Sequence, residues 1–294
     1  MSVTTLLRRA CLPLLGLVLL GSCTTQRLAV RAMTSLLDSG FAALNEETDL
    51  ILAEHSAASS LKLLEGLIKE RPLDGALLLR AAQGYIGYSL AFAEGTDSNR
   101  ASLLYSRGRD YALRALAAST HRYQPEIWLD PDATERFLAG LDRTFVPVLF
   151  WAANGWAGTI NNSRDDPDVL AEIPTVLAIA RFVLNNEPNY HHGGAHLVVG
   201  SIVGSFPASL GGDPAAARTH FEQAIGVSDG GFLMAYVLYA QTFAVQSQNR
   251  TLFETLLRKV LEAPPHVLPE QNLANAVARA RAGQLLEQVD DFFI

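Results

Sequence analysis

Apolar residues at helical spacing, separated by proline and glycine breakers, are the feature that most constrains how this chain can fold. After residue 30 they recur every three or four positions, as in Leu61, Leu64, Leu67 and Ile68, whereas runs that alternate apolar and polar residues are scarce. Breakers lie between the stripes, for example at Pro72, Pro125, Asp166-Pro167, Gly211-Gly212 and Pro264-Pro265. The pattern predicts an all-α chain of roughly twelve helices of ordinary length.

Several of the expected helices carry the small-large-small spacing of tetratricopeptide-type repeats, in which helix pairs recur about every 34 residues. Small side chains matter there because they let neighbouring helix axes approach to about 8–10 Å. The matches are Ala217/Phe221/Ala224, Phe253/Leu257/Val260, Ser60/Leu64/Leu67 and Gly108/Ala112/Ala115. We therefore predict a tetratricopeptide-like solenoid of helical hairpins that forms a single domain over residues 31–294. A non-repetitive helical bundle is the alternative.

The first 22 residues have the pattern of a secretory signal. Arg8 and Arg9 precede an apolar run over residues 10–20, which is too short to span a bilayer. The run ends in Leu20-Gly21-Ser22-Cys23, which resembles a bacterial lipobox. We expect Cys23 to carry acyl chains such as palmitate, followed by a tether over residues 23–30. The alternative is ordinary secretion with an incidental cysteine.

The same pattern predicts a location in the bacterial cell envelope, lipid-anchored to a membrane and facing the periplasm. Thr24 follows the cysteine where an Asp would suggest retention at the inner membrane, so the outer membrane is expected.

Composition and missing motifs exclude several classes of function. A net charge of −7 without a Lys/Arg block argues against nucleic acid as a partner. Of the two cysteines, Cys11 leaves with the signal and Cys23 is the lipidation residue, so the mature body has no thiol chemistry. Signature motifs for nucleophile elbows, phosphate loops, dinucleotide folds and zinc proteases are absent. We therefore expect no enzymatic activity, no catalytic residue and no cofactor.

The most aromatic stretch of the chain is the best candidate for a ligand site. It contains Phe145, Phe150, Trp151, Asn154 and Trp156 within twelve residues. Aromatic rings can line an apolar ligand channel, because they offer a large contact area at low entropic cost. The alternative, which we favour from the sequence, is a buried seam between helices.

Two groups of basic residues have both a functional and a structural interpretation. His191, His192 and His196 have a spacing that could suit a metal, but Gly193-Gly194 interrupts them and no carboxylate is near in sequence. We predict a helix start there, with the glycines allowing close packing, and no metal site. A second group, Arg107, Arg109 and Arg114, is expected to spread around one helix, either solvated or facing an anionic ligand or partner.

An ordered series of short segments resembles a known family. The segments are Leu61-Lys62-Leu63-Leu64-Glu65-Gly66-Leu67, Gly84-Tyr85, Ala91-Phe92-Ala93-Glu94, Leu104-Tyr105-Ser106-Arg107-Gly108, Arg114-Ala115-Leu116, Val146-Pro147-Val148-Leu149-Phe150-Trp151, Trp156-Ala157, Tyr190, Gly193-Gly194, His196, Leu210-Gly211-Gly212 and His220-Phe221-Glu222-Gln223-Ala224. Together they resemble the T-component (TatT-like) lipoproteins of tripartite ATP-independent periplasmic (TRAP) transporters.

The resemblance implies a lipid-anchored, all-helical accessory component of solute uptake. Such a protein associates with the periplasmic substrate-binding P-component, forms a homotrimer and holds a small hydrophobic ligand. Tyr85, Tyr105, Arg107, Tyr190 and His196 are then candidates for partner contact or for packing. An envelope scaffold with protein-interaction roles only is the alternative. Gly155, Gly158 and Gly226 depart from the larger residues that the resemblance leads us to expect.

Overall fold

Every regular element that the structure describes is a helix, and the described part contains no strand. The structure is a computed structural model that describes residues 36–293, so the signal, Cys23 and the tether lie outside the described residues. Residues 36–46 and 47–293 belong to two separate units, and the first contributes one helix over residues 36–45. The prediction of an all-α fold is confirmed, while the domain boundary at residue 31 stays a prediction.

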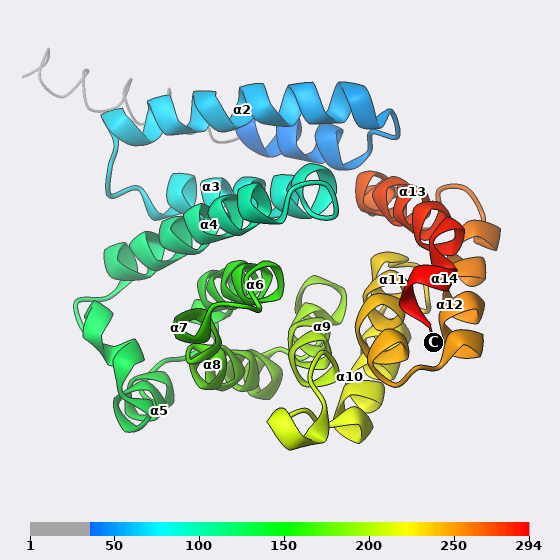
Figure 1. The fold of residues 1–294 in the computed structure, drawn as a ribbon. Coiled ribbons are helices and arrows are strands. Elements are labelled where there is room, and N and C mark those ends of the chain that lie inside the picture. The colour runs from blue at the N-terminus through cyan, green and yellow to red at the C-terminus, as the bar shows by residue number, and fades with distance from the viewer. Residues whose placement is uncertain (1–35, 294) are drawn as a thin grey trace, which may run out of the picture. The chain divides into compact units, whose positions relative to one another are not determined.

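The larger unit, residues 47–293, contains thirteen α-helices (Figure 1). They are α2 (Leu50–Glu70), α3 (Gly75–Tyr88), α4 (Ser98–Ser119), α5 (Pro131–Ala139), α6 (Val146–Asn162), α7 (Pro167–Leu170), α8 (Ile173–Asn186), α9 (Tyr190–Gly204), α10 (Pro214–Val227), α11 (Met234–Tyr239), α12 (Arg250–Glu262), α13 (Asn272–Glu287) and α14 (Val289–Phe292). Between them lie 3-10 turns at Pro125–Leu129, Arg143–Phe145, Ala208–Leu210 and Pro269–Gln271.

Six of the described helices, α2, α3, α4, α5, α7 and α10, begin at an aspartate whose side chain accepts hydrogen bonds from otherwise unpaired backbone N–H groups. Asp49 accepts from Ile51 N at 3.0 Å, and Asp213 accepts from Ala216 N at 3.0 Å. Pro214 occupies the first helical position after Asp213, as the sequence predicts. Asp49, which precedes α2, therefore has a local structural role as the cap of that helix.

Small residues let the helices pack closely, as expected from the small-large-small spacing. Ala217, Phe221 and Ala224 are all fully buried on α10. Gly200 of α9 faces the Phe221 ring, where an added Cβ would lie 3.1 Å from it. The predicted match Ser60/Leu64/Leu67 on α2 is wrong at its first position, because Ser60 is exposed. The row that α2 buries is Ala57, Leu61, Leu64 and Ile68.

The departures at Gly155 and Gly158 have a physical reason in the contact between α4 and α6. A Cβ at Gly155 would lie 2.9 Å from the Tyr105 carbonyl oxygen and 2.9 Å from the Arg109 nitrogen. A Cβ at Gly158 would overlap the Tyr105 ring. Larger residues are therefore excluded at both positions. By contrast, Gly226 has no atom within 4 Å of an added Cβ.

Two helices run into π-helical segments with related sequences. The π-helix η1 (Ser89–Ala93) follows α3, and the π-helix η5 (Ala240–Ala244) follows α11. Each begins after a Tyr-x-x-Tyr segment, at 85–88 and at 236–239, and each contains Phe-Ala, at 92–93 and at 243–244. The same local structure and the same pattern thus recur 151 residues apart.

The long helices of the larger unit pack mostly on the next long helix along the chain, with α4 on α6 and α6 on α8, and α13 returns to α2 (Figure 1). Helix α13 contacts α2, and the side chain of Arg281 on α13 binds Glu94 and the Leu90 carbonyl beside η1. An open repeat array keeps its two ends apart, because each repeat contacts only its neighbours. The superhelical solenoid therefore stays a prediction.

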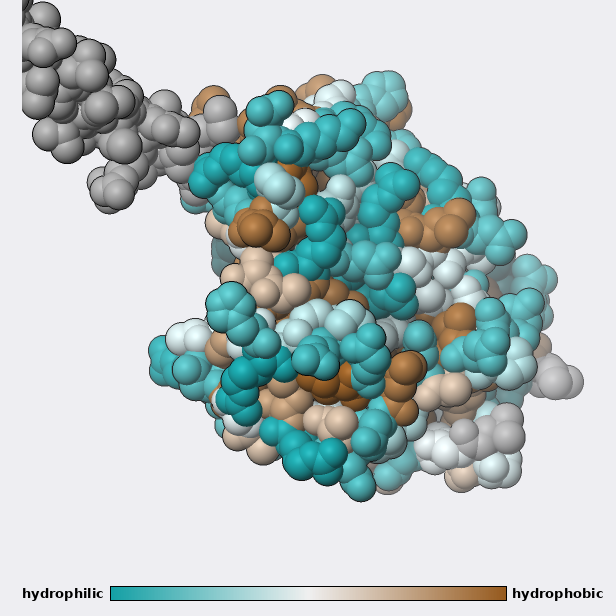
Figure 2. Space-filling model, turned by 90° about the vertical axis from the view of Figure 1, so that its left-hand side faces the viewer, coloured by the Kyte–Doolittle hydropathy of each residue, from teal (hydrophilic) through white to brown (hydrophobic). Residues whose placement is uncertain are grey.

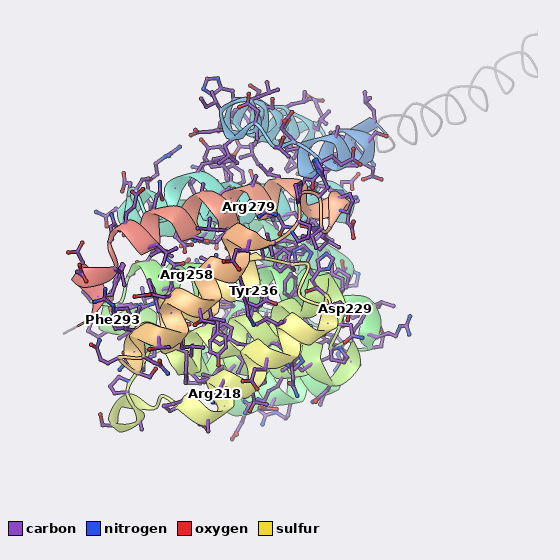
Figure 3. The ribbon with its side chains drawn as sticks, turned by 90° about the vertical axis from the view of Figure 1, so that its right-hand side faces the viewer. Arg218, Asp229, Tyr236, Arg258, Arg279 and Phe293 are labelled. Carbon is purple, nitrogen blue, oxygen red and sulfur yellow. The ribbon has the colours of Figure 1, made fainter. Side chains whose placement is uncertain are left out.

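The C-terminal helices are joined by an arginine that caps its neighbour. Arg279 of α13 lies beside α12, and its guanidinium donates to the carbonyls of Val260 at 2.8 Å, Ala263 at 3.1 Å and Pro264 at 2.9 Å (Figure 3). These include carbonyl groups at the C-terminal end of α12, which have no partner within the helix. One bidentate side chain thus fixes α13 against the end of α12.

The outer surface is largely polar on the face shown in Figure 2, where hydrophilic side chains predominate and hydrophobic areas lie between them. Within residues 36–293 we find no helix with both the length and the apolar character that crossing a bilayer requires.

Candidate functional site

Aromatic and imidazole rings from two helices gather between α6 and α9, in a group we call the α6–α9 cluster: Phe150, Trp151, Tyr190 and His191. The Trp151 and His191 rings lie 4.9 Å apart, and the Phe150 ring lies 5.2 Å from that of Tyr190. Phe150, Trp151 and Tyr190 are three of the residues that the sequence singles out. The structure therefore brings together two predicted ligand candidates and one predicted partner or packing candidate.

The backbone of α9 begins in a left-handed turn. His191 has φ 47° and His192 has φ 56°, followed by Gly193 at φ 73°. This conformation costs a residue with a Cβ about 1–2 kcal/mol, so two successive histidines are strained. Strain of this kind gathers at functional sites, which makes the turn a reason to examine the cluster beside it.

Close packing around the two glycines holds the strained turn in place. A Cβ on Gly193 would lie 3.1 Å from the Ala224 Cα of α10, and a Cβ on Gly194 would lie 2.5 Å from the Phe150 ring of α6. Neither neighbour can approach so closely if a side chain intervenes. The prediction that Gly193-Gly194 permits close packing at a helix start is confirmed.

One polar group in the α6–α9 cluster, the Trp151 indole N–H, is buried and lacks a hydrogen bond of normal geometry among the described residues. Burial raises the pKa of the Tyr190 hydroxyl, and the nearby indole of Trp151 partly offsets this rise. Burial, with a smaller effect from His192, lowers the pKa of His191 to about 4. The imidazole is therefore neutral at pH 7 and able to accept or donate a hydrogen bond.

Trp156, another predicted ligand candidate, lies apart from this cluster and is satisfied within the chain. Its indole N–H donates to Glu172 Oε2 at 2.6 Å. The Arg109 guanidinium lies 5.2 Å from the ring centre, and the Trp128 ring packs against it edge-on at 5.9 Å. These contacts describe a packed seam between helices, the interpretation that we favour from the sequence.

The remaining ligand candidates are less enclosed. Phe145 lies in the 3-10 turn before α6 and is partly buried, and Asn154 is partly buried on α6 itself. Trp151 is 8% exposed and Trp156 is 4% exposed within this chain. A role for these residues in binding a ligand stays a prediction.

Tyr85 and Tyr105, two of the predicted partner or packing candidates, belong to separate hydrogen-bond networks. The Tyr85 hydroxyl donates to Glu65 Oε1 at 2.6 Å, and the Arg107 guanidinium lies 5.3 Å from the Tyr85 ring centre. The Tyr105 hydroxyl is fully buried and donates to Glu94, which also binds Arg281. Burial raises the pKa of Tyr105 well above its usual value, and the Glu94 charge adds to the rise.

The three histidines near the start of α9 point to different partners. His191 belongs to the α6–α9 cluster, and the His192 ring stacks on Phe232 at 5.3 Å. His196 Nδ1 lies 2.8 Å from His220 Nδ1 on α10. A neutral imidazole can donate to a neutral partner in this way, whereas two protonated rings cannot. Each histidine thus has a packing partner of its own.

Several functional candidates were missed by reasoning from the sequence. A surface hollow of about 330 Å³ lies between α5 and α8, and its lining includes Leu138, Phe182 and Asn185. The acidic partners Glu65, Glu94 and Glu172 also went unnoticed, because no sequence pattern links them to Tyr85, Tyr105 or Trp156. One available signal was the seven-residue spacing of Arg100, Arg107 and Arg114 on α4. The expectation that Arg107, Arg109 and Arg114 spread around the helix is wrong for Arg107 and Arg114, which share one face, whereas Arg109 lies on another face, against Trp156.

Comparison with known proteins gives two findings. The model of a family described as "TRAP transporter T-component" matches residues 46–293, which is most of the chain. An uncharacterized protein of Treponema pallidum (strain Nichols) is 25% identical over 316 residues, and the alignment covers 98% of each chain. T-components are accessory parts of TRAP transporters, which work in the bacterial envelope. The match over nearly all of the described helices shows that this chain belongs to the family of TRAP transporter T-components.

Proposed function

We propose that this T-component is anchored by lipid at Cys23, faces the periplasm, and binds both the periplasmic substrate-binding protein of its TRAP system and a small hydrophobic or amphipathic ligand. Family membership supports the role in transport, and the lipobox pattern Leu20-Gly21-Ser22-Cys23 supports the anchor. The outer membrane is the proposed site of the anchor, and a homotrimer is the proposed assembly. Acyl chains such as palmitate at Cys23 make anchoring stable, because several chains together hold far better than one.

The observation that carries ligand binding is the unsatisfied Trp151 N–H beside the strained His191. A buried donor without an acceptor costs about 1–3 kcal/mol, and the left-handed turn adds strain. A ligand with an apolar body and a hydrogen-bond acceptor at one end would satisfy the donor and contact the rings of Phe150 and Tyr190. The proposed ligand class is therefore amphipathic rather than purely apolar.

Affinity capture from solubilised membranes tests both halves of this proposal. Mass spectrometry of the captured material should identify a periplasmic substrate-binding protein and an amphipathic small molecule. Trp151→Phe should lose the small molecule and keep the protein partner, whereas Trp156→Phe should keep both. Repeated captures without any periplasmic binding protein would contradict the transport role. Equal ligand content in the two variants would contradict the site.

Fractionation tests the anchor separately. The wild-type chain should sediment with outer-membrane fractions, and Cys23→Ser should move it to the soluble periplasmic fraction. Sedimentation of the solubilised chain should give the mass of three copies. Membrane association that is unchanged in Cys23→Ser would overturn the lipid anchor without bearing on ligand or partner binding.

One observation favours a second function, that of an envelope scaffold which binds proteins only. Trp151 and Trp156 are both buried within the chain, as in a filled core rather than an open channel. On this hypothesis the capture experiment recovers protein partners, and the purified chain contains no small molecule.

A further inference from the structure

Three arginines on α4 each lie against a tyrosine ring, in a row that we call the Arg–Tyr ladder. Arg100 lies 5.5 Å from the ring centre of Tyr88, Arg107 lies 5.3 Å from that of Tyr85, and Arg114 lies 5.1 Å from that of Tyr111. The arginines follow one another at seven-residue spacing, so they share one face of the helix. At 1.5 Å per residue the row is about 21 Å long.

The tyrosines of the ladder are held in fixed positions because their hydroxyl groups donate hydrogen bonds to two glutamates of α2. Glu54 accepts from the Tyr88 hydroxyl at 3.2 Å, and Glu65 accepts from Tyr85 at 2.6 Å and from Tyr111 at 3.2 Å. The Tyr85 and Tyr111 rings are stacked, with centres 5.7 Å apart and planes 11° apart. The rings are thus a rigid support on which the guanidinium groups rest.

The carboxylates beneath the ladder are already engaged by other groups. Burial acts to raise the pKa of Glu65, but its bonds from Lys62 and Tyr85 outweigh burial and hold the pKa at about 2. Lys62 Nζ lies 2.7 Å from Glu65 Oε2, whereas Arg107 Nη1 is farther away, at 3.8 Å from Glu65 Oε1. Glu65 is therefore fully charged at neutral pH and saturated with donors.

The face of the ladder is locally positive on an acidic chain. Four cations, Lys62 and the three arginines, are exposed beside two carboxylates, Glu54 and Glu65, that are partly buried. The acidic residue of α4, Asp110, is exposed and is bonded to Arg109 at 2.9 Å. Arg107 remains 52% exposed, so much of its hydrogen-bonding edge is open to solvent. The chain as a whole has a net charge of −7.

We propose that the Arg–Tyr ladder docks an acidic face of a partner protein, and that carboxylates of the partner bind the three guanidinium groups. The inference rests on the proposed function, in which that partner is the periplasmic substrate-binding protein, and it adds which surface binds and by what chemistry. Arginine and tyrosine dominate the energetics of protein interfaces, and a guanidinium presents paired donors that match a carboxylate. Arginines already fixed on aromatic rings lose little freedom when they bind.

The alternative, an anionic lipid surface, fits the ladder less well. Mobile headgroups are attracted by net charge near the surface, which flexible lysines provide as well as arginines. Here three of the four cations are arginines held at regular intervals on rings. A fixed row suits a fixed pattern of acidic side chains, which a folded protein offers and a fluid bilayer does not.

Binding of the purified substrate-binding protein to the intact lipoprotein in detergent tests this inference. A triple variant, Arg100→Glu with Arg107→Glu and Arg114→Glu, should weaken binding by at least about 30-fold, because charge reversal turns attraction into repulsion. A triple arginine-to-lysine variant keeps the charge but loses the paired donors, so its loss should be smaller, about 5-fold. Wild-type affinity should fall as salt rises, and the glutamate variant should lose that dependence.

A matched control uses arginines outside the ladder. Arg136, Arg181 and Arg258 are also exposed on helices, so their triple glutamate variant makes the same change in net charge. It should bind as the wild type does. Thermal unfolding of each variant shows whether the helices remain folded, and the single change Arg107→Gln gives a mild variant that should still weaken binding several-fold.

The outcomes separate the two proposals. If the wild type does not bind the substrate-binding protein, the proposed partner is wrong and this inference fails with it. If the wild type binds and the ladder variants bind equally well, only the docking surface is wrong. Vesicles of phosphatidylglycerol and phosphatidylcholine in equal parts provide the last comparison. Loss of vesicle binding in the ladder variant of the lipid-free Cys23→Ser chain, with protein binding intact, would assign the ladder to lipid and overturn the inference.

Discussion

The guanidinium of Arg281 lies 3.2 Å from the carboxylate of Glu94, a residue 187 positions earlier in the chain. This ion pair joins α13 to the segment after the first π-helix and is shielded from water, since the Arg281 side chain is only 9% exposed. Arg281 also donates to the Leu90 carbonyl, and Glu94 also accepts from Tyr105. Three elements of the helical unit, α13, η1 and α4, therefore meet at one pair of charges.

Arg281→Ala should lower the free energy of unfolding by about 2–4 kcal/mol. Removing one partner of a buried pair leaves the other charge and a carbonyl unpaired, which costs more than the pair itself contributes. Urea denaturation followed by circular dichroism measures the change. Arg258→Ala serves as the control, because its ion pair is exposed and should contribute less than about 1 kcal/mol. Equal stability of the two variants would contradict the role of Arg281.

Gly158→Ala should destabilise the chain by about 1–3 kcal/mol, because its Cβ would overlap the Tyr105 ring and force α4 and α6 apart. Gly66→Ala is the matched change on α2, where an added Cβ has no atom within 4 Å. It should instead stabilise the chain by about 0.5–1 kcal/mol, since alanine favours the helix. Thermal melting of both variants gives the comparison, and a shift in the same direction would be inconsistent with close packing at Gly158.

A comparison of the two tryptophans of α6 isolates the contribution of one hydrogen bond to the free energy of unfolding. Trp151→Phe and Trp156→Phe remove the same atoms, but only the Trp156 N–H donates to an acceptor in normal hydrogen-bond geometry, Glu172 Oε2 at 2.6 Å, whereas the Trp151 N–H has at most a weak contact with the Tyr190 hydroxyl. A hydrogen bond to a charged group contributes about 1.5–3 kcal/mol, so Trp156→Phe should be the more destabilising change by about that amount. Chemical denaturation without ligand measures the difference, and equal losses would argue against it.

Acid should destabilise the fold through its buried histidines. Burial, with a smaller effect from His192, lowers the pKa of His191 from 6.5 to about 4. Burial also lowers the pKa of His196, where His220 adds to the effect, and of His220, where Asp213 opposes it. The unfolded chain therefore binds more protons than the folded chain below pH 6.5, and stability decreases as the pH falls from about 6.5 towards 4.

His191→Asn tests the contribution of the α6–α9 cluster to this pH dependence. Asparagine tolerates the left-handed conformation and does not titrate, so the variant should lose less stability than the wild type between pH 6.5 and 4. Urea midpoints at several pH values measure the slope. The exposed His55 gives a control in His55→Gln, which should keep the slope of the wild type. A slope that is unchanged in His191→Asn would contradict the assignment.

Local signals in the sequence predicted the helices well, because the physics that forms them is local. Asp213-Pro214 predicted a helix start at which a side chain caps the backbone, and the structure confirms it. Ala217 and Phe221 predicted a buried face correctly. On α2 the apolar residues are so frequent that two faces fit the pattern. The repeat match there was begun at Ser60, which is exposed, although Leu64 of the same match is buried.

The candidate site depended on contacts that no local pattern encodes. Phe150 and Trp151 were found through their clustering in sequence, whereas the left-handed backbone of His191 goes against the preference of that residue. It is imposed by the approach of α6 and α10 to the two glycines. The pairing of Arg281 with Glu94 likewise arises only once the chain has folded. The Tyr-x-x-Tyr segment that precedes each π-helix was a long-range pattern available in the sequence.

The contact between α13 and α2 limits where this chain can be lengthened. In an open array, a duplicated helix pair can be added at either end, because the exposed end face accepts another unit. Here α13 already lies against α2, and Arg281 of α13 also pairs with Glu94 at the end of η1. A helix pair stacked between α13 and α2 would separate these charges, whereas an insertion in a surface connection would leave them paired.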